Sequence, residues 1–416
     1  MNFLVYKLFL LLYSVGIRIA ALWNIKAKQW VKGREEFPKT LKSSGKQTVW
    51  MHCASLGEFE QGRPVLEKLK NENSNISIVL TFFSPSGYEI TKNYSGADYI
   101  FYLPMDSKSN AKKLLDVINP TLVLWVKYEY WHFYLAEIKK RNIPLLLVSG
   151  IFLPYQPFFK WYGSHWKNML KNFSHLFVQN EASKDALAQI GYTNNITISG
   201  DTRFDRVITI AEKFEPIELV EKFCADKKVI VAGSTWEEDE AELIHYVRVN
   251  PDIKFIIAPH SIDSENLKEI KSEFANSIFY SEALNATSEI ILSKNVLIIN
   301  NIGMLSRLYK YGTICYVGGA FTDNGVHNVL EAAVYGKPVI YGPEYEKYLE
   351  AIELIDNGGA ISINNALELE IEFNKLLTDE TALKNAEIVA REYVYSRAGA
   401  TEKIVNYIYE KRLLTN

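Results

Sequence analysis

Two series of short apolar runs, each alternating with amphipathic stretches, constrain the fold of this chain more than any other feature. The first series lies at 47–54, 76–83, 99–104, 121–127, 144–149 and 175–179, and the second at 228–234, 254–258, 296–300, 313–318 and 338–341. Helical patterns separate the runs, for example at 58–71, 107–118 and 130–141, and a last one covers 398–413. Near-continuous apolar strands that alternate with helices are typical of buried parallel sheets. We therefore expect an α/β chain with two Rossmann-like, doubly wound domains that face a cleft.

The composition is that of a globular protein and disfavours several classes. The chain has 416 residues, enough for two or three domains, and its 48% hydrophobic and 23% charged residues exclude a disordered or collagenous protein. Its three cysteines (Cys53, Cys224 and Cys315) form no CxxC pair, which favours a reducing compartment. No GxGxxG follows the first run and no GxxxxGK[ST] occurs, which disfavours dinucleotide-binding and P-loop proteins. The seven histidines show no metal-ligand spacing, so we expect no metal.

The formal net charge of −3 is the sum of a basic N-terminal segment and an acidic remainder of the chain. Residues 1–50 hold nine Lys and Arg against two Glu, a balance of +7, which leaves 37 basic and 47 acidic residues, or −10, for the rest. Residues 1–23 are almost uninterrupted apolar sequence, followed by the basic run Lys26, Lys28, Lys32, Arg34, Lys39, Lys42 and Lys46. Such a run suits the anionic cytoplasmic leaflet of a membrane.

The periodicity of the apolar segment at 1–23 predicts how this segment would bind a membrane. At about 100° per residue, Lys7, Ser14 and Arg18 share one narrow helical stripe, and the opposite face carries Val5, Phe9, Leu12, Ile19 and Trp23. This pattern favours a helix lying in the membrane interface, because a spanning helix would have to bury Arg18. A single membrane span and a helix packed on the body are the alternatives.

Two acidic residues follow strand ends in the first series. Glu58 lies in Cys53-Ala54-Ser55-Leu56-Gly57-Glu58, where a strand ends and a helix begins, and Glu129 follows the run at 121–127. The helix dipole stabilises an anion in a first helical turn. Ligands of open α/β sheets bind beyond the carboxyl ends of strands, where a carboxylate can accept a proton from a substrate hydroxyl. Ordinary helix N-terminal chemistry is the alternative for both residues.

Three later segments carry candidate ligands for an anion. Arg203 and Arg206 lie in a polar stretch between the two series and suit a phosphate, although a solvated linker explains them too. We expect Ser234 and Thr235 at a helix start, where hydroxyl and backbone N–H groups suit an anion or a nucleotide, although the acidic run that follows is also explained by a capped, solvated helix start. The most specific segment runs from Gly318-Gly319 to Gly336-Lys337-Pro338, and we expect a helix to open at His327-Asn328 with Glu331 one turn later. A glycine loop before a helix N-terminus favours a phosphate, and Glu331 would reach a ribose hydroxyl.

Together these motifs resemble the 3-deoxy-D-manno-octulosonic acid (Kdo) transferases, lipopolysaccharide enzymes with the GT-B glycosyltransferase fold. The resemblance covers nearly the whole chain, through Ser55-x-Gly57-Glu58, Thr81-x-x-Ser84-Pro85-Ser86-Gly87, Leu103-Pro104-x-Asp106, Glu129-x-Trp131, Gly200-x-x-Arg203-Phe204-Asp205, Ala232-Gly233-Ser234-Thr235 and Gly325-x-His327-Asn328-x-x-Glu331. It implies an inverting enzyme that moves Kdo from CMP-Kdo to a lipid A precursor resembling lipid IVA. It also implies a location at the cytoplasmic face of the inner membrane, without a cofactor or a nucleic-acid partner.

The resemblance further implies a role for each matching residue. Glu58 would be the catalytic base, acting late with an ordinary carboxylate pKa of about 4, and Glu129 a second acid near the acceptor. The donor site would comprise Arg203, Ser234, Thr235, His260, Gly318, Gly319, Gly325, His327, Asn328 and Glu331. The acceptor site would comprise Ser55, Gly57, Ser84, Ser86 and Trp131. Arg203 and a helix dipole would neutralise the CMP phosphate without a metal.

The expected domains are an anchoring segment at 1–45, an acceptor domain at 46–205 and a donor domain at 206–416, whose last helix can return to the acceptor domain. The chain departs from the family pattern at Ala258-Pro259-His260-Ser261, which lacks an arginine, and at Ala332, where proline is common. The alternatives are a GT-B glycosyltransferase that uses a UDP-sugar on a lipid-linked acceptor, a GT-B sugar-nucleotide epimerase and a non-catalytic membrane-bound scaffold.

Overall fold

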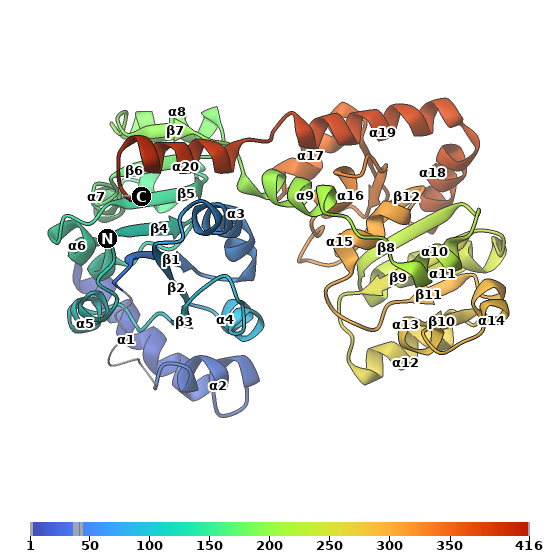
Figure 1. Cartoon of the computed structure of the whole chain (residues 1–416), viewed down its shortest axis with the longest axis horizontal. Coiled ribbons are helices and arrows are strands. Elements are labelled where there is room, and N and C mark those ends of the chain that lie inside the picture. Colours follow the sequence, from blue (N-terminus) through green and yellow to red (C-terminus); the bar gives the residue numbers. More distant parts are fainter. Residues whose placement is uncertain (1–2, 36–40, 42–44, 415–416) are drawn as a thin grey trace. The chain divides into compact units, whose positions relative to one another are not determined.

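The computed structural model describes residues 3–35, 41 and 45–414, so Lys39 and Lys42 of the basic run lie outside the described residues. The chain divides into two compact units, the first formed by Met1–Arg206 with Ala398–Asn416 and the second by Val207–Arg397. Each unit contains one parallel sheet of seven strands with helices on its faces (Figure 1). The predicted α/β class with two doubly wound sheets is confirmed.

The first sheet has the strand order β3-β2-β1-β4-β5-β6-β7. Its strands are β1 (Gln47–Cys53), β2 (Ile76–Phe82), β3 (Tyr99–Tyr102), β4 (Leu122–Val126), β5 (Leu145–Gly150), β6 (His175–Val178) and β7 (Ile196–Ile198). The helices of this unit are α1 (Phe3–Ala20), α2 (Ile25–Lys32), α3 (Leu56–Glu72), α4 (Pro85–Thr91), α5 (Lys108–Ile118), α6 (His132–Lys140), α7 (Ser164–Leu170), α8 (Glu181–Gln189) and α20 (Ala400–Glu410). A 3-10 turn, η1, covers Pro157–Phe159.

The second sheet has the strand order β10-β11-β9-β8-β12-β13-β14. Its strands are β8 (Val229–Thr235), β9 (Lys254–Pro259), β10 (Ser277–Phe279), β11 (Val296–Ile298), β12 (Ile314–Val317), β13 (Val339–Tyr341) and β14 (Ala360–Ser362). The remaining helices are α9 (Thr202–Glu212), which crosses the boundary between the units, α10 (Glu218–Cys224), α11 (Glu237–Val249), α12 (Ser264–Glu273), α13 (Tyr280–Ala283), α14 (Ser288–Ser293), α15 (Leu305–Leu308), α16 (Leu330–Ala333), α17 (Leu349–Asn357), α18 (Ala366–Thr378) and α19 (Glu380–Tyr395), with the 3-10 turn η2 (Tyr309–Tyr311).

In each sheet the strand order reverses at one pair of neighbouring strands. In the first sheet the chain runs outward from β1 to β3 and then returns to add β4 on the other side of β1; in the second, β8 and β12 have the same relation. In open α/β sheets, ligands bind beyond the carboxyl ends of the strands at such a switch point. The topology therefore predicts one site beside the ends of β1 and β4 and another beside the ends of β8 and β12.

The central strands of the first sheet bury side chains on both faces. In β1, Trp50 belongs to the core under α5, α6 and α7, while Val49 and Met51 belong to the core under α3 and α20. This two-sided burial explains why the central strands read as continuous apolar runs.

Three strands were not predicted, β7, β10 and β14; each has three residues and lies at the edge of its sheet.

The N-terminal helix α1 packs on the first unit along one side only. Tyr6 and Leu10 are its buried residues, and the Tyr6 hydroxyl donates a hydrogen bond of 2.5 Å to Asp106. Asp106 also accepts the backbone N–H groups of Phe133 and Tyr134, so it joins α1 to the start of α6. Most apolar side chains of α1 remain exposed, including Val5, Phe9, Leu12 and Ile19 of the predicted apolar face.

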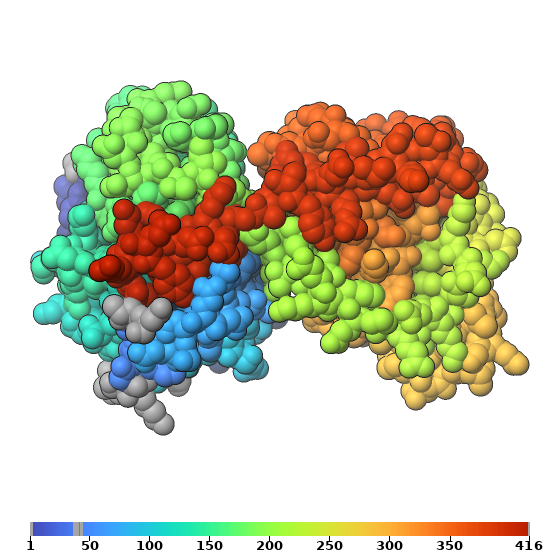
Figure 2. All heavy atoms as spheres, turned by 45° about the horizontal axis from the view of Figure 1, so that its top comes forward, coloured from blue at the N-terminus to red at the C-terminus, as the bar shows by residue number. Residues whose placement is uncertain are grey.

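The last helix, α20, packs against α3 of the first unit, as Figure 2 shows by the red C-terminal segment beside the blue one. Its first turn receives a capping residue from a distant part of the chain. Asp205 accepts the backbone N–H groups of Gly399 and Thr401, both at 2.6 Å. A carboxylate at a helix N-terminus satisfies unpaired N–H groups and interacts favourably with the helix dipole.

We predict that Asp205→Ala loosens α20 while leaving the first sheet intact. Loss of a capping side chain costs about 1–2 kcal/mol, which should speed amide hydrogen exchange across 400–410 by roughly fivefold or more. The control is Asp185→Ala on α8, an exposed aspartate without a hydrogen-bond or ion-pair partner among the described residues. Equal protection of α20 in both variants would contradict the capping role.

Candidate active site

Glu58 lies in the first turn of α3, directly after β1, and only 8% of its surface is exposed. Its carboxylate accepts the backbone N–H groups of Ala54 and Tyr128. Burial raises the pKa of Glu58 to about 7, the Ala54 hydrogen bond opposes this rise, and the negative charge of Glu129 adds to it. The expected pKa of about 4 is therefore wrong, because that value ignores desolvation.

Glu129 follows β4 and is held by two side chains. Its Oε2 lies 3.0 Å from His52 Nε2 and accepts the Trp131 indole N–H at 2.9 Å. The other His52 nitrogen lies 3.0 Å from Thr81 Oγ1 on β2. If Nε2 of a neutral His52 carries the proton, it donates to the carboxylate and Nδ1 accepts from Thr81. The position of the Glu129 carboxylate thus depends on three adjacent strands: β4, which it follows, β1, which carries His52, and β2, which carries Thr81.

His52 and Lys127 are site residues that the sequence analysis missed. His52 is fully buried in the middle of an apolar run, and its position becomes meaningful only when β1 pairs with β2 and β4. Lys127 directly follows β4 with a positive φ of 53°. Its charge lowers the pKa values of both Glu58 and Asp201, against the effect of burial. The position of Lys127 directly after a strand is the sequence signal that could have identified it as a site residue.

The predicted acceptor residues also lie at this edge of the first sheet. Ser55 precedes α3 without capping it through its side chain, and a Cβ at Gly57 would meet only Ser55 Oγ at 4.0 Å. Ser84 caps α4 by accepting the Ser86 N–H, and the two hydroxyl oxygens lie 2.8 Å apart. Trp131 is oriented by its hydrogen bond to Glu129. The edge offers carboxylates and hydroxyl groups, a set that suits a polyhydroxylated substrate.

Arg203 belongs to the first unit, in the first turn of α9. Its Nε and Nη2 atoms lie 2.9 and 2.7 Å from Asp201 Oδ2, which is a fork-shaped ion pair. Burial works to raise the pKa of Asp201, but the charges of Arg203 and Lys127 and two hydrogen bonds from Arg203 lower it. Asp201 therefore stays ionised and fixes the direction of the guanidinium group.

In the second unit, Asp239 organises the glycine loop that follows β12. Its carboxylate accepts the Gly319 N–H at 2.8 Å, the Trp236 N–H at 2.9 Å and the Tyr316 hydroxyl at 2.7 Å. Gly319 has a φ of +96°, and a Cβ there would lie 2.6 Å from the carbonyl oxygen of Gly325. This close approach requires glycine. A Cβ at Gly318 would likewise lie 2.5 Å from the Ser234 carbonyl oxygen.

Three rings stack beside this loop. Trp236 lies 4.4 Å from His260, and His260 lies 4.8 Å from His327, measured between ring centroids. The Trp236 indole N–H donates to His327 Nε2 at 3.2 Å, so Nδ1 carries the proton of the neutral ring. Burial, assisted by the charge of His260, lowers the pKa of His327 to about 4. His327 is therefore a neutral donor at neutral pH rather than a cation for a phosphate.

The expected helix opening at His327 is wrong. His327 and Asn328 lie in an extended loop, and α16 covers only Leu330–Ala333. Asn328 Oδ1 accepts the Leu330 N–H at 3.3 Å, and its Nδ2 donates to Glu331 at 3.1 Å. A helix of one turn has only a weak dipole, so side chains and loop N–H groups would have to bind any anion here.

Ser234 and Thr235 occupy the end of β8 rather than a helix start. Ser234 has a φ of +55° at a shift in register between β8 and β9. The Thr235 hydroxyl is buried and donates a hydrogen bond to Glu240 at 2.7 Å. This hydroxyl therefore has a structural role. Gly325 has a φ of +81°, and a Cβ there would lie 2.7 Å from the Tyr348 ring.

The structure divides the predicted residues between its two units. Glu58, Glu129, Ser55, Gly57, Ser84, Ser86, Trp131 and Arg203 belong to the first unit, and Ser234, Thr235, His260, Gly318, Gly319, Gly325, His327, Asn328 and Glu331 to the second. Within the described part of the chain, no group of three His, Cys, Asp or Glu side chains is arranged to hold a metal.

Known proteins resemble this chain in sequence and in fold. A family model for 3-deoxy-D-manno-octulosonic-acid transferase matches residues 29–206. The 3-deoxy-D-manno-octulosonic acid transferase of Aquifex aeolicus is 29% identical over 362 residues, which cover 84% of this chain and 92% of the relative. A bifunctional glycosyltransferase/methyltransferase of Fusobacterium nucleatum is 27% identical over 380 residues; the match covers 88% of this chain but only 55% of that protein.

Among solved structures, the UDP-GlcNAc 2-epimerase of Neisseria meningitidis bound to UDP-GlcNAc matches with a TM-score of 0.63 and 17% identity. The match covers 88% of this chain and 100% of the epimerase, and at this identity it shows the shared GT-B-like fold alone. The sequence matches to Kdo transferases extend over most of the chain, at 22–29% identity. Over most of its length the chain is thus similar in sequence to 3-deoxy-D-manno-octulosonic acid (Kdo) transferases, and these matches indicate a glycosyltransferase.

Proposed function

We propose that this chain transfers Kdo from CMP-Kdo to a lipid A precursor in lipopolysaccharide biosynthesis. The single observation that carries the mechanism is the buried Glu58 carboxylate, with a pKa of about 7, at the switch point of the first sheet. A general base works best when its pKa lies near the working pH. The sequence relatives support the choice of Kdo as the transferred sugar.

The proposed reaction is a direct displacement with inversion at the anomeric carbon of Kdo. The acceptor hydroxyl oxygen forms the new bond to that carbon, its proton passes to Glu58, and the bond from carbon to the phosphate oxygen breaks. The electron pair of that bond leaves with CMP. Because the transition state resembles an oxocarbenium ion, a carboxylate suffices to remove the proton late in the reaction.

The donor residues are proposed in the second unit, around the loop from Gly318 to Glu331. Loop N–H groups and the neutral His327 can donate to the CMP phosphate, and Glu331 is proposed to accept from a ribose hydroxyl. Arg203, oriented by Asp201, is proposed to neutralise phosphate charge as CMP departs. Glu129 is proposed to orient the acceptor, because His52 and Trp131 hold its carboxylate in one place.

The proposed location is the cytoplasmic face of the inner membrane, with α1 as the anchor. This helix is long and apolar enough to cross a membrane by length and composition. We favour a position in the interface, because Tyr6 and Leu10 fix one side of α1 to the first unit while Leu8, Leu11 and Leu12 are exposed.

Replacing Glu58 with glutamine should remove the base and leave the shape of the site. We expect kcat/KM for Kdo transfer to fall by about 10²–10⁴-fold, measured with CMP-Kdo and a lipid A precursor. The matched control is Glu181→Gln, which changes an exposed first-turn glutamate of α8 in the same unit. Transfer at the wild-type rate by Glu58→Gln would refute the assignment of the base.

The pH profile should report the pKa of Glu58. Burial raises this pKa to about 7, so the carboxyl group is protonated and inactive below that pH. We expect kcat/KM to rise tenfold per pH unit up to about pH 7 and then to level off. Glu58→Gln should lose this limb from its residual activity. A limb that persists in the variant would assign it to another group.

Binding measurements should identify the donor nucleotide. By calorimetry we expect CMP to bind more tightly than UDP, and Glu331→Gln to weaken CMP binding by roughly tenfold or more through a lost hydrogen bond to a charged group. Glu289→Gln, an exposed first-turn glutamate of α14 in the same unit, should bind CMP as the wild type does. Tighter binding of UDP would instead support an enzyme acting on a UDP-sugar, and incubation with UDP-N-acetylglucosamine alone would then test for epimerisation.

A further inference from the structure

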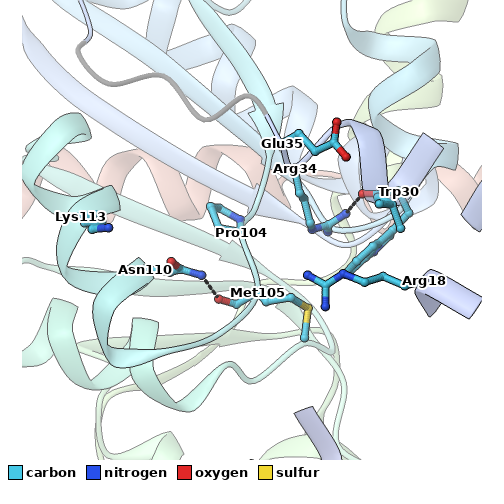
Figure 3. Close-up of a pocket in the computed structure, with 9 residues that line it drawn as sticks. Arg18, Trp30, Arg34, Glu35, Pro104, Met105, Asn110 and Lys113 are labelled. Carbon is cyan, nitrogen blue, oxygen red and sulfur yellow. Dashed lines mark hydrogen bonds between the residues drawn. The ribbon is translucent and has the colours of Figure 1, made fainter. Parts of the chain in front are cut away.

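A cavity of about 350 Å³ lies in the first unit, between α1, α2, α5 and the segment after β3 (Figure 3). Its lining includes three cationic side chains, Arg18, Arg34 and Lys113, and one acidic side chain, Glu35. In Figure 3, Arg18 and Arg34 lie beside Trp30, and Lys113 lies on the other side of the cavity. None of these residues belongs to the proposed transfer site.

Arg34 is the fixed cation of this cavity. Its three nitrogen atoms donate to the backbone carbonyl groups of Leu103, Trp30 and Phe83, and its guanidinium carbon lies 3.7 Å from the Trp30 ring centroid. Within the part of the chain that the structure describes, Arg34 has no carboxylate at ion-pair distance. Arg34 is half-buried, so its charge is only partly solvated and an anion that reaches it would interact favourably with it.

Arg18 and Lys113 add two exposed cations to the same cavity. Arg18 donates to Ser14 on its own helix at 2.9 Å, and both Arg18 and Lys113 are exposed. Neither has a carboxylate partner among the described residues. Three cations against the single carboxylate of Glu35 give the lining a net charge of about +2 at neutral pH, which favours an anion such as a phosphate.

The cavity adjoins a large exposed apolar surface on α1. Leu11, Val15, Ile19 and Leu22 lie near Arg18 in the sequence and are 45–81% exposed. A free phosphate ion would fill only a small part of the cavity, whose volume is within the range of sites for whole small molecules. A ligand with a phosphate and attached acyl chains would occupy the cavity and cover the apolar side of α1 as well.

We propose that this cavity binds the phosphate headgroup of an anionic glycerophospholipid, with Arg34 as the fixed ligand and Arg18 and Lys113 closing on the phosphate. The acyl chains run along the exposed side of α1 into the membrane. This proposal rests on the proposed membrane contact of α1 and adds a specific site to it. One bound lipid would orient the first unit on the membrane, whereas a diffuse basic surface would not.

The test uses the full chain and a soluble lipid, dihexanoyl-phosphatidylglycerol, below its critical micelle concentration. Calorimetry should show saturable binding of one lipid per chain, with much weaker binding of dihexanoyl-phosphatidylcholine and of inorganic phosphate. The double variant Arg18→Gln/Lys113→Gln should bind at least tenfold more weakly, because each lost contact is a charge-assisted hydrogen bond. Arg34 is left unchanged because it is packed among aromatic rings.

The matched control is Lys7→Gln/Lys112→Gln, which removes the same charge from exposed positions on the same two helices, outside the cavity. The control should bind the soluble lipid within about twofold of the wild type, since exposed single charges act weakly. Equal loss in both double variants would overturn the site in favour of diffuse attraction. Inorganic phosphate binding as tightly as the lipid would overturn the choice of a lipid.

Vesicles of phosphatidylcholine with phosphatidylglycerol separate this proposal from the membrane contact on which it rests. If the wild type does not bind such vesicles, the proposed membrane contact fails and the lipid site fails with it. If the wild type binds them, and both double variants bind the vesicles and the soluble lipid equally, the membrane contact stands and only the lipid site is refuted.

Discussion

The desolvation of one carboxylate is the interaction on which the account of this protein depends. Glu58 follows β1 at the point where the first sheet reverses its strand order, and its burial raises its pKa to about 7. Its oxygen atoms accept backbone N–H groups of Ala54 and Tyr128, which position the carboxylate, and the charge of Lys127 opposes part of the rise in pKa. A group held this way changes protonation near neutral pH, which is the property that a base for an alcohol needs.

The same edge of the sheet holds the second acid by a chain of polar contacts through the core. Glu129 is linked through His52 to Thr81, which accepts the indole N–H of Trp50. The chain crosses β4, β1 and β2, so the register of these strands determines where the carboxylate lies. In the second unit, Asp239 has a comparable role, because it holds the glycine loop through backbone N–H groups. In both units, hydrogen-bonded acids position the surface that the substrates are proposed to meet.

The sequence predicted the parts of the structure that depend on local pattern. The central strands and the turn before Glu58 were predicted correctly, because two-sided burial and helix-start chemistry are visible in neighbouring residues. The edge strands β7, β10 and β14 were missed, since three residues at a sheet edge carry too little apolar signal. The roles of His52 and Lys127, the raised pKa of Glu58 and the absence of a helix at His327 depend on contacts between distant segments. Such contacts leave no periodic trace in the sequence.

The most direct test of the central claim is to count the sugars that the protein adds to its acceptor. Freshly generated CMP-Kdo and a lipid A precursor are incubated with the full chain, and the lipid is analysed by mass spectrometry. We expect the mass of the lipid to increase by one or more whole Kdo residues, with release of CMP. A folded protein that binds CMP but leaves the lipid unchanged, or that modifies it only with a UDP-sugar, would contradict the account.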